Sequence, residues 1–484
     1  MSKTYLLLVK TLILLLSAFL SFYALSNAQR FHPDEAFYMT IARHAAVNGD
    51  WLLLAEPLDK PPLTFYTNAL ALVFLAVETD ANVVLQLDPL KGEFAGRIPS
   101  VLMSVLIVAV GMQLACSLTD DNQIALITGM LLTLTPLRIV FAPTAFTDLP
   151  MLLFGMLSLW MASRRCFIWA GICFATSISA KPQVIFYLPL IIVIFFVQRS
   201  SLKHLISSIL RFSVPAMVVV LLLWGWDSLR IAQEAESFYQ LGQSRYTVTQ
   251  ITPLSDYPQR LLLWWQTNQY LLGNGLITVI GVAIALMTTV YQYRKWQLSQ
   301  EHSLLWLWVL AFNGIHFMLT LNLFDRNQLV LMPIVIILVS SGLTRIKQGW
   351  LTAIVISGMF IFACQATQWQ LPIGGDDGRH DGIHELADYL NNKPVATVIY
   401  DRWLDWELDY YMGQWTNKRR VYYPTPDALA IGMQELDETG MRYLVAPSDI
   451  DITSWLGAVQ DIGFIVESDF SNDNFVVYRL QPPE

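Results

Sequence analysis

The sequence predicts a mainly α-helical protein that crosses the membrane many times and ends in a small α/β domain. Composition is the first observation: 55% of the 484 residues are hydrophobic and 14% are charged, with a mean hydropathy of +0.46. Apolar segments of membrane-spanning length recur along residues 1–369 and are missing from residues 370–484. This last part is acidic, since its 8 Lys and Arg face 20 Asp and Glu, against a charge of −8 for the whole chain. The sequence therefore predicts two domains, residues 1–369 and residues 370–484.

Eleven segments are predicted to span the membrane, because about 17–25 apolar residues cross a hydrocarbon core about 30 Å thick. They lie near residues 4–26, 98–118, 122–140, 149–163, 166–180, 182–198, 205–229, 271–291, 303–322, 327–344 and 349–367. Residues 63–77 are also apolar, but they follow two prolines inside a charged loop. We expect them to form a helix that lies along the interface.

Basic residues predict the orientation of these segments. With a cytoplasmic N-terminus, alternate connections carry Lys3 and Lys10, Arg164 and Arg165, Arg199 and Lys203, Arg294 and Lys295, and Arg345 and Lys347, as cytoplasmic loops do. The acidic turn Asp120-Asp121 is an exception. The long loops 27–97 and 230–270 and the C-terminal domain are then extracytoplasmic, and loop 230–270 is long enough to cover a site. An alternative for the first segment is a cleaved signal peptide, with Ser26-Asn27-Ala28 as the cleavage site.

The C-terminal domain has the alternating and apolar runs of an α/β fold. Residues 374–378 (Gly-Gly-Asp-Asp-Gly) are predicted to be a linker. Strands are expected at 395–400, 442–446, 463–467 and 474–479, and helices near 382–391 and 427–435.

Several classes of function are excluded. Nucleic acid is not expected as a partner, because its phosphates require a basic surface and this tail is acidic. The four cysteines (Cys116, Cys166, Cys173 and Cys364) lie in or beside predicted spans, so neither a disulfide framework nor a cysteine-based zinc site is expected. The sequence contains no phosphate-binding loop and no dinucleotide glycine pattern.

Ionisable residues at the ends of the predicted spans carry the functional argument. The predicted outer face holds Asp34, Glu35, Lys60, Arg97, Asp148, Lys181 and Arg326. Charges near hydrocarbon are costly, so a chain keeps them mainly where they are used. Sugar transfer from a polyprenyl-phosphate donor needs a carboxylate for the acceptor hydroxyl and cations for the leaving phosphate, and this face has both.

The order of the motifs resembles a known family. Pro33-Asp34-Glu35 is followed by Gly49-Asp50-Trp51, Lys60-Pro61-Pro62-Leu63 and Gly96-Arg97-Ile98-Pro99-Ser100, and then by Thr147-Asp148-Leu149-Pro150, Ala180-Lys181-Pro182 and a segment from Arg326 to Pro333. Over roughly residues 4–345 this series is similar to the type C integral-membrane glycosyltransferases, which include protein O-mannosyltransferases and aminoarabinose transferases. The usual aromatic-rich ending of the arginine segment is here Asn327-Gln328-Leu329.

The resemblance implies a role for each residue. Asp34 would be the catalytic carboxylate that faces the acceptor, with Glu35 as its positioning partner. Lys60 and Arg326 would contact the donor phosphate, and Asp148, Lys181 and Arg97 would line the same cavity. The reaction would transfer a sugar, with inversion, from a polyprenyl phosphate to a hydroxyl of a protein, lipid or glycan. No metal or other cofactor is required by this scheme.

Each residue also has a structural interpretation. Asp34 would cap a helix over residues 35–47 that Gly49 ends, and Glu35 suits its first turn. Lys60 would extend its ammonium to the membrane surface, and Arg97 would anchor the start of a span. Asp148 would cap a helix that has Pro150 in its first turn, and Lys181 would reach lipid headgroups.

Two further alternatives remain at this stage. His32 with Asp34 and Glu35, or His380 with His384, would supply metal ligands, but a loop histidine and a helix capped by Asp381 are expected instead. A secondary transporter of a polar or anionic solute is the competing function. Such proteins usually place ionisable residues near the bilayer midplane in repeated halves, a pattern that this sequence lacks.

Overall fold

A computed structural model describes residues 2–198, 201–246, 250–295, 300–346, 349–374, 378–413, 416–435 and 440–483. Arg199, Lys347 and the predicted linker residues 375–377 lie outside these ranges. The chain forms two compact units. The first contains residues 1–28, 50–68 and 97–375, and the second contains residues 29–49, 69–96 and 376–484. The domain boundary predicted after residue 369 stays a prediction.

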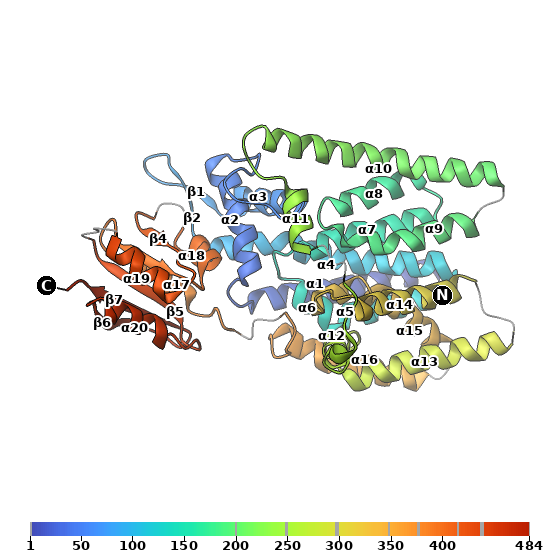
Figure 1. The fold of residues 1–484 in the computed structure, drawn as a ribbon. Helices are drawn as coiled ribbons and strands as arrows, with labels where there is room; N and C mark the ends of the chain where they lie inside the picture. Colours follow the sequence, from blue (N-terminus) through green and yellow to red (C-terminus); the bar gives the residue numbers. More distant parts are fainter. Residues whose placement is uncertain are drawn as a thin grey trace. The chain divides into compact units, whose positions relative to one another are not determined.

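The first unit is a bundle of apolar helices that run roughly parallel to one another (Figure 1). Five helices are long and apolar enough to cross a membrane: α1 (Lys3–Ser26), α4 (Pro89–Thr119), α10 (Leu202–Ile231), α13 (Gly275–Arg294) and α16 (Gly349–Thr367). Only 11% of the apolar window of α10 is buried, so most of its apolar surface faces outward. A surface of this kind is stable in lipid and unstable in water. The structure thus confirms a polytopic, mainly α-helical membrane fold.

The other predicted spans also contain helices, but these helices are shorter or interrupted. They are α5 (Asn122–Leu134), α6 (Pro136–Phe141), α7 (Asp148–Ser163), α8 (Phe167–Ile178), α9 (Leu188–Val197), α14 (Gln300–Met318) and α15 (Met332–Ile346), with 3-10 turns η1 (Pro182–Tyr187) and η3 (Asp325–Leu329). The predicted span 122–140 is broken at Thr135, because Pro136 cannot donate the next helical hydrogen bond. Residues 63–77 contain α3 (Leu63–Leu75), whose 13 residues are fewer than a bilayer crossing requires.

The loop predicted at 230–270 is largely helical. It holds α11 (Phe238–Tyr246), the 3-10 turn η2 (Leu254–Asp256) and α12 (Tyr257–Asn268). A compact helical connection can be held in one position, as a structureless loop of this length cannot.

The second unit is built around a five-stranded sheet. Its strands are β3 (Val398–Asp401), β4 (Arg419–Val421), β5 (Arg442–Pro447), β6 (Ile465–Ser471) and β7 (Phe475–Gln481), in the order β4-β3-β5-β7-β6. β3 is parallel to β4 and β5, whereas β5, β7 and β6 pair antiparallel. The helices are α17 (Ile383–Asn391), α18 (Asp405–Tyr411), α19 (Pro426–Glu435) and α20 (Thr453–Asp461). The four predicted strands and both predicted helices of the tail are confirmed, whereas β4, α18 and α20 are additions.

Alternation along the strands gives this sheet two covered faces. Val398 and Tyr400 point to the same side and pack with Leu429 of α19 and Trp455 of α20 in one buried cluster. On the other side, Tyr389 of α17 stacks on Phe470 with ring centroids 4.6 Å apart.

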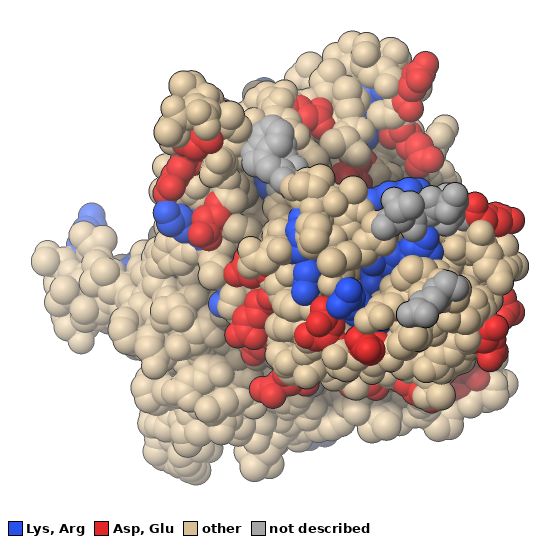
Figure 2. Space-filling view, turned by 90° about the vertical axis from the view of Figure 1, so that its left-hand side faces the viewer, with Lys and Arg blue, Asp and Glu red and all other residues tan. Residues whose placement is uncertain are grey.

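On the molecular face drawn in Figure 2, Lys and Arg side chains gather in the middle and Asp and Glu side chains lie around them.

The second unit also contains two segments from the N-terminal part of the chain. These are α2 (Pro33–Asn48) and the hairpin of β1 (Val77–Thr79) and β2 (Leu85–Leu87), which leads into the start of α4. Gly49 ends α2 with a φ of +73°, as its sequence position predicts. Gly96 lies in α4 directly against the Met39 side chain of α2, where a Cβ atom would collide with it.

Candidate functional site

Three sequence motifs of the first unit meet at one place, although they lie far apart along the chain. The Leu63 amide, just after Lys60-Pro61-Pro62, donates a hydrogen bond to the Ser179 carbonyl oxygen at 3.0 Å, two residues before Lys181. The Asn68 side-chain amide donates to the carbonyl oxygen of Ala145 at 3.3 Å, three residues before Asp148. The start of α3 therefore joins the lysine motif to the two motifs at residues 147–150 and 180–182.

Asp148 and Lys181 form an ion pair. The Lys181 Nζ lies 2.6 Å from Asp148 Oδ1, and the Asp148 side chain is 2% exposed against 15% for Lys181. The helix α7 begins at Asp148 itself and its N-cap is Thr147, so the expected capping role of Asp148 is wrong. Lys181 reaches this acid, not lipid headgroups. The Asp148 carboxylate lies at the N-terminus of α7, where a negative charge is favoured, and it holds the Lys181 ammonium beside this helix end.

Arg326 lies beside the same helix start. Its guanidinium carbon is 5.2 Å from the ring centroid of Phe146, two residues before Asp148, and 5.2 Å from that of Phe324. The Gln183 side-chain amide donates to Asn327 Oδ1 at 3.4 Å and the Tyr187 hydroxyl to the Val330 carbonyl oxygen at 2.7 Å. These contacts join the arginine motif to the segment that follows Lys181.

Asp325 belongs to this cluster and was missed in the sequence analysis. Its carboxylate accepts hydrogen bonds from the Gly374 amide at 2.6 Å and from the Arg326 amide at 2.7 Å. Burial raises the pKa of Asp325, and the negative charge of Asp148 adds to this, while the two amides and the Arg326 charge oppose it. An acid directly before an arginine in a connection between apolar segments is the signal that would have identified it.

Lys60 lies beside α11 and contacts residues at its C-terminal end. Its Nζ is 3.6 Å from Asp59 Oδ2 and 3.4 Å from the ring centroid of Tyr246. The Arg245 guanidinium is 3.1 Å from Asp59 Oδ2, and the Tyr246 hydroxyl donates to the same oxygen at 2.6 Å. A Cβ on Gly242 would be 2.9 Å from the Asp59 carbonyl oxygen, so glycine permits this close approach. At 8% exposure, Lys60 is buried in protein, and the expected extension to the membrane surface is wrong.

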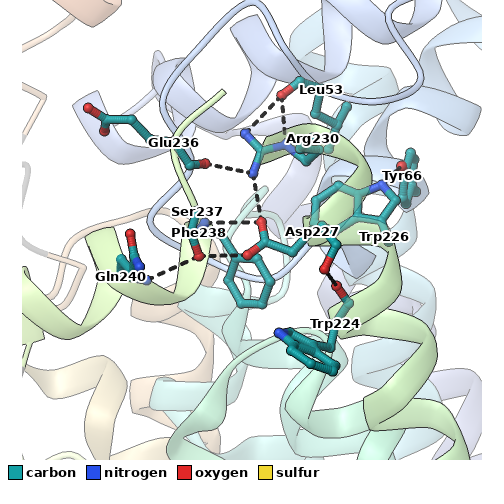
Figure 3. A network of polar contacts seen from close by, with 11 residues as sticks. Leu53, Tyr66, Trp224, Trp226, Asp227, Arg230, Glu236, Ser237, Phe238 and Gln240 are labelled. Atoms are coloured by element: carbon teal, nitrogen blue, oxygen red, sulfur yellow. Dashed lines mark hydrogen bonds and ion pairs between the residues drawn. The ribbon is translucent and has the colours of Figure 1, made fainter. Parts of the chain in front are cut away.

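A second polar network fixes the start of α11 (Figure 3). Arg230, at the end of α10, donates to the Leu53 carbonyl oxygen from Nε at 3.3 Å and from Nη2 at 3.2 Å. Its Nη1 donates to Asp227 Oδ1 and to the Glu236 carbonyl oxygen, both at 3.2 Å. Asp227 in turn accepts from the Ser237 hydroxyl at 2.6 Å and from the Phe238 amide at 3.3 Å. These bonds attach α11 to α10 and to the loop that leads to Lys60, so the loop 230–270 covers the lysine motif.

Arg97 is buried inside α4, with 2% of its surface exposed. The helix begins eight residues earlier, at Pro89, and the predicted span begins directly after Arg97, so the anchoring interpretation stays a prediction.

Asp34 and Glu35 lie at the start of α2 in the second unit. The N-cap of α2 is His32, whose Nδ1 accepts from the Asp34 amide at 3.0 Å, while Glu35 Oε2 accepts from the His32 amide at 3.3 Å. This reciprocal capping box corrects the expectation that Asp34 is the cap. Glu35 is buried and holds the turn, and Asp34 is half-buried in the first turn.

No group of three or more potential metal ligands occurs among the residues that the structure describes. The cap of α17 is Gly382, not Asp381 as the sequence predicts. His380 Nδ1 lies 3.3 Å from Glu407 Oε1 in α18, which gives this histidine a structural partner.

Solved structures share this fold over nearly the whole chain. ArnT from Cupriavidus metallidurans in the apo state has a TM-score of 0.66 at 13% identity, covering 97% of both chains. The same protein bound to undecaprenyl phosphate has a TM-score of 0.61 at 14% identity, covering 99% of this chain and 98% of that chain. Arabinofuranosyltransferase AftD from Mycobacteria has a TM-score of 0.50 at 14% identity, covering 99% of this chain and 40% of the other. No protein-family model and no curated protein matches the sequence.

The fold is therefore that of the type C integral-membrane glycosyltransferases, the class that the order of motifs resembles. Within this class, ArnT is similar to the chain over its full length, including both units.

Proposed function

We propose that the protein is a membrane glycosyltransferase that moves a sugar from a polyprenyl-phosphate donor to a hydroxyl acceptor on the extracytoplasmic side. The observation that supports this proposal is that the segments carrying Lys60, Lys181 and Arg326 meet through the contacts of Leu63 and Phe146. Cations gathered at the ends of apolar helices fit a ligand with a phosphate head and a hydrocarbon tail. A structural neighbour, ArnT, has been solved with undecaprenyl phosphate bound.

The donor phosphate would be bound by Lys60 and Arg326, with Asp148, Lys181 and Arg97 lining the same cavity. Each of Lys60, Lys181 and Arg326 has an acid close by, namely Asp59, Asp148 and Asp325. An entering phosphate would replace part of that negative charge, and the cations would stabilise the charge that grows on it as the sugar leaves. In this scheme the protein uses no metal ion.

Asp34 would accept the proton of the acceptor hydroxyl, with Glu35 keeping the turn in position. The acceptor oxygen then forms a bond to C1 of the sugar, and the bond from C1 to the phosphate oxygen breaks on the opposite face. The products are the glycosylated acceptor, with inverted configuration, and free polyprenyl phosphate. A general base of this kind contributes about 10²- to 10⁴-fold to the rate.

The test measures release of free polyprenyl phosphate by purified protein, offered a panel of polyprenyl-phosphate hexoses and pentoses with membrane extracts as acceptors. We expect release from one donor by the wild type, and a loss of at least about 100-fold in Asp34→Asn. Asp473→Asn, a change at an exposed acid of the tail, is the matched control and should retain wild-type rates.

Undiminished release by Asp34→Asn would contradict the role of Asp34. No release from any donor by folded wild-type protein would contradict the proposed reaction and return attention to solute transport.

A further inference from the structure

The C-terminal domain holds α2, the helix that carries Asp34 and Glu35, at both of its ends. All of the contacts lie within the second unit. They involve one short helix of the tail, α18, which the sequence analysis did not predict.

The first attachment is at the residues that lead into α2. The Phe31 amide donates to the Tyr411 hydroxyl oxygen at 2.8 Å, and that hydroxyl in turn donates to Glu93 at the start of α4. Glu93 also accepts from Arg30 at 2.7 Å. Glu93 and Tyr411 are almost fully buried, at 5% and 3% exposure, so water cannot easily replace these bonds. Arg30 and Phe31 precede the capping residue His32 directly.

The second attachment is near the other end of the helix. Arg43 donates to the carbonyl oxygens of Tyr410 at 2.8 Å and Asp409 at 3.0 Å, at the C-terminus of α18. A cation is favoured there by the helix dipole. Between the two attachments, the Phe37 ring packs on Trp406 with centroids 4.2 Å apart.

The start of α4 completes this arrangement. The Tyr410 hydroxyl donates to the Pro89 carbonyl oxygen at 3.0 Å, and Gly92 leaves the space that this hydroxyl occupies. The Phe31 ring meets Tyr410 edge-on at 4.9 Å. One face of α18 thus contacts both α2 and the beginning of α4.

We infer that the C-terminal domain positions Asp34 for transfer, through Tyr411, Glu93 and Arg43. This inference rests on the proposed function of Asp34. A general base works only within hydrogen-bond reach of its proton, and a misplacement of about 1 Å costs about 100-fold. Contacts that fix both ends of α2 limit its sliding and rotation, and the tail supplies most of them.

The test compares Tyr411→Phe with Tyr389→Phe in the full-length protein. Both remove one tyrosine hydroxyl from the C-terminal domain, but Tyr389 bonds to Asp469, away from α2. We expect Tyr411→Phe to lower kcat for polyprenyl phosphate release about tenfold or more with the donor KM unchanged, and to speed hydrogen exchange of the amides in residues 31–38. Tyr389→Phe should change neither quantity. Equal behaviour of the two variants would overturn the inference.

A second variant covers the case in which Tyr411→Phe fails to fold. Arg43→Lys keeps the positive charge at the C-terminus of α18 and loses only the fork of donors that reaches both carbonyl oxygens. Arg43→Gln loses the charge as well, so Arg43→Lys should lower kcat less than Arg43→Gln does. The same rate in both, at equal thermal midpoints, would contradict positioning by Arg43. If the wild type itself releases no polyprenyl phosphate, the proposed function fails, and the hydrogen-exchange comparison still decides whether the tail fixes α2.

Discussion

Arg230 and Arg326 are both cations near the ends of apolar helices in the first unit, but their surroundings differ. Arg230 is completely buried, and all three of its guanidinium nitrogens donate to oxygens of Leu53, Asp227 and Glu236. Arg326 is half-buried and lies over the rings of Phe146 and Phe324. Burial with every nitrogen bonded to a fixed oxygen thus marks a structural cation, whereas a partly exposed cation over ring faces can still reach a ligand.

The largest effect is expected on stability, when Arg230, the structural member of this pair, is replaced. Arg230→Met leaves the buried Asp227 carboxylate without its cation, and removing one partner of a buried pair costs about 3–5 kcal/mol. Arg326→Met, the matched change, should lower the thermal midpoint far less and instead weaken donor use. Thermal unfolding in detergent, together with a donor titration, measures both. A larger loss of stability in the Arg326 variant would contradict the comparison.

Two buried acids, Asp227 and Asp401, also differ in how fully they are hydrogen-bonded, and the expected effect on stability is the second largest. Both oxygens of Asp227 accept hydrogen bonds, whereas Asp401 Oδ2, buried at the end of β3, has no partner among the described protein atoms. Burial raises the pKa of Asp401 to about 6, while the Leu404 and Trp403 amides and Arg420 oppose the shift. The folded state therefore binds the proton more tightly than the unfolded chain, and this stabilisation is full below about pH 4 and lost as pH rises through about 6.

Asp401→Asn should remove this pH dependence and stabilise the tail at pH 8 by up to about 3 kcal/mol. Hydrogen exchange of Val398–Asp401 between pH 4.5 and 8, corrected for the intrinsic rate, measures it. Asp473→Asn is the control. Parallel profiles for Asp401→Asn and the wild type would show that the raised pKa does not affect stability.

A smaller effect on donor use is expected at Lys60. Lys60→Ala should raise the donor KM about tenfold, because it removes one of the cations that attract the phosphate while Arg326 and Lys181 remain. Lys91→Ala, at a lysine whose side chain is 54% exposed, is the control. Steady-state release of polyprenyl phosphate measures KM and kcat, and an unchanged kcat/KM for the donor would place Lys60 outside the phosphate site.

The smallest expected effect is that of metal removal. If Lys60, Lys181 and Arg326 supply the positive charge, chelation by EDTA should leave the rate of release unchanged. Restoration of a lost rate by added Mg²⁺ or Mn²⁺, but not by Ca²⁺, would show that protein cations alone do not suffice.

The sequence predicted well what depends on local patterns. The helix that follows Asp34 and ends at Gly49, the four longer strands of the tail and the apolar segments all follow from periodicity and terminal residues. The three-residue β4 and the seven-residue α18 escaped because such short elements carry almost no periodic signal. His32 was not expected as a cap, since Asp and Asn are the stronger capping residues.

The sequence could not predict which distant residues contact one another. The motifs predicted Lys60, Asp148, Lys181 and Arg326 as a group, and the structure brings their segments together. It does so through contacts such as that of Asn68 with Ala145, which are 77 residues apart. No local property of either residue indicates the other, because this pairing depends on how the intervening helices pack.

The composition of the second unit has a consequence for biosynthesis. Arg43 bonds to Tyr410, a residue made 367 positions later. At about 5–20 residues per second, a ribosome needs roughly 20–70 s to cover that distance. During this interval α2 has been translated, but α18, the helix that contacts both of its ends, has not. A nascent chain stalled before residue 405 should therefore leave α2 open to protease.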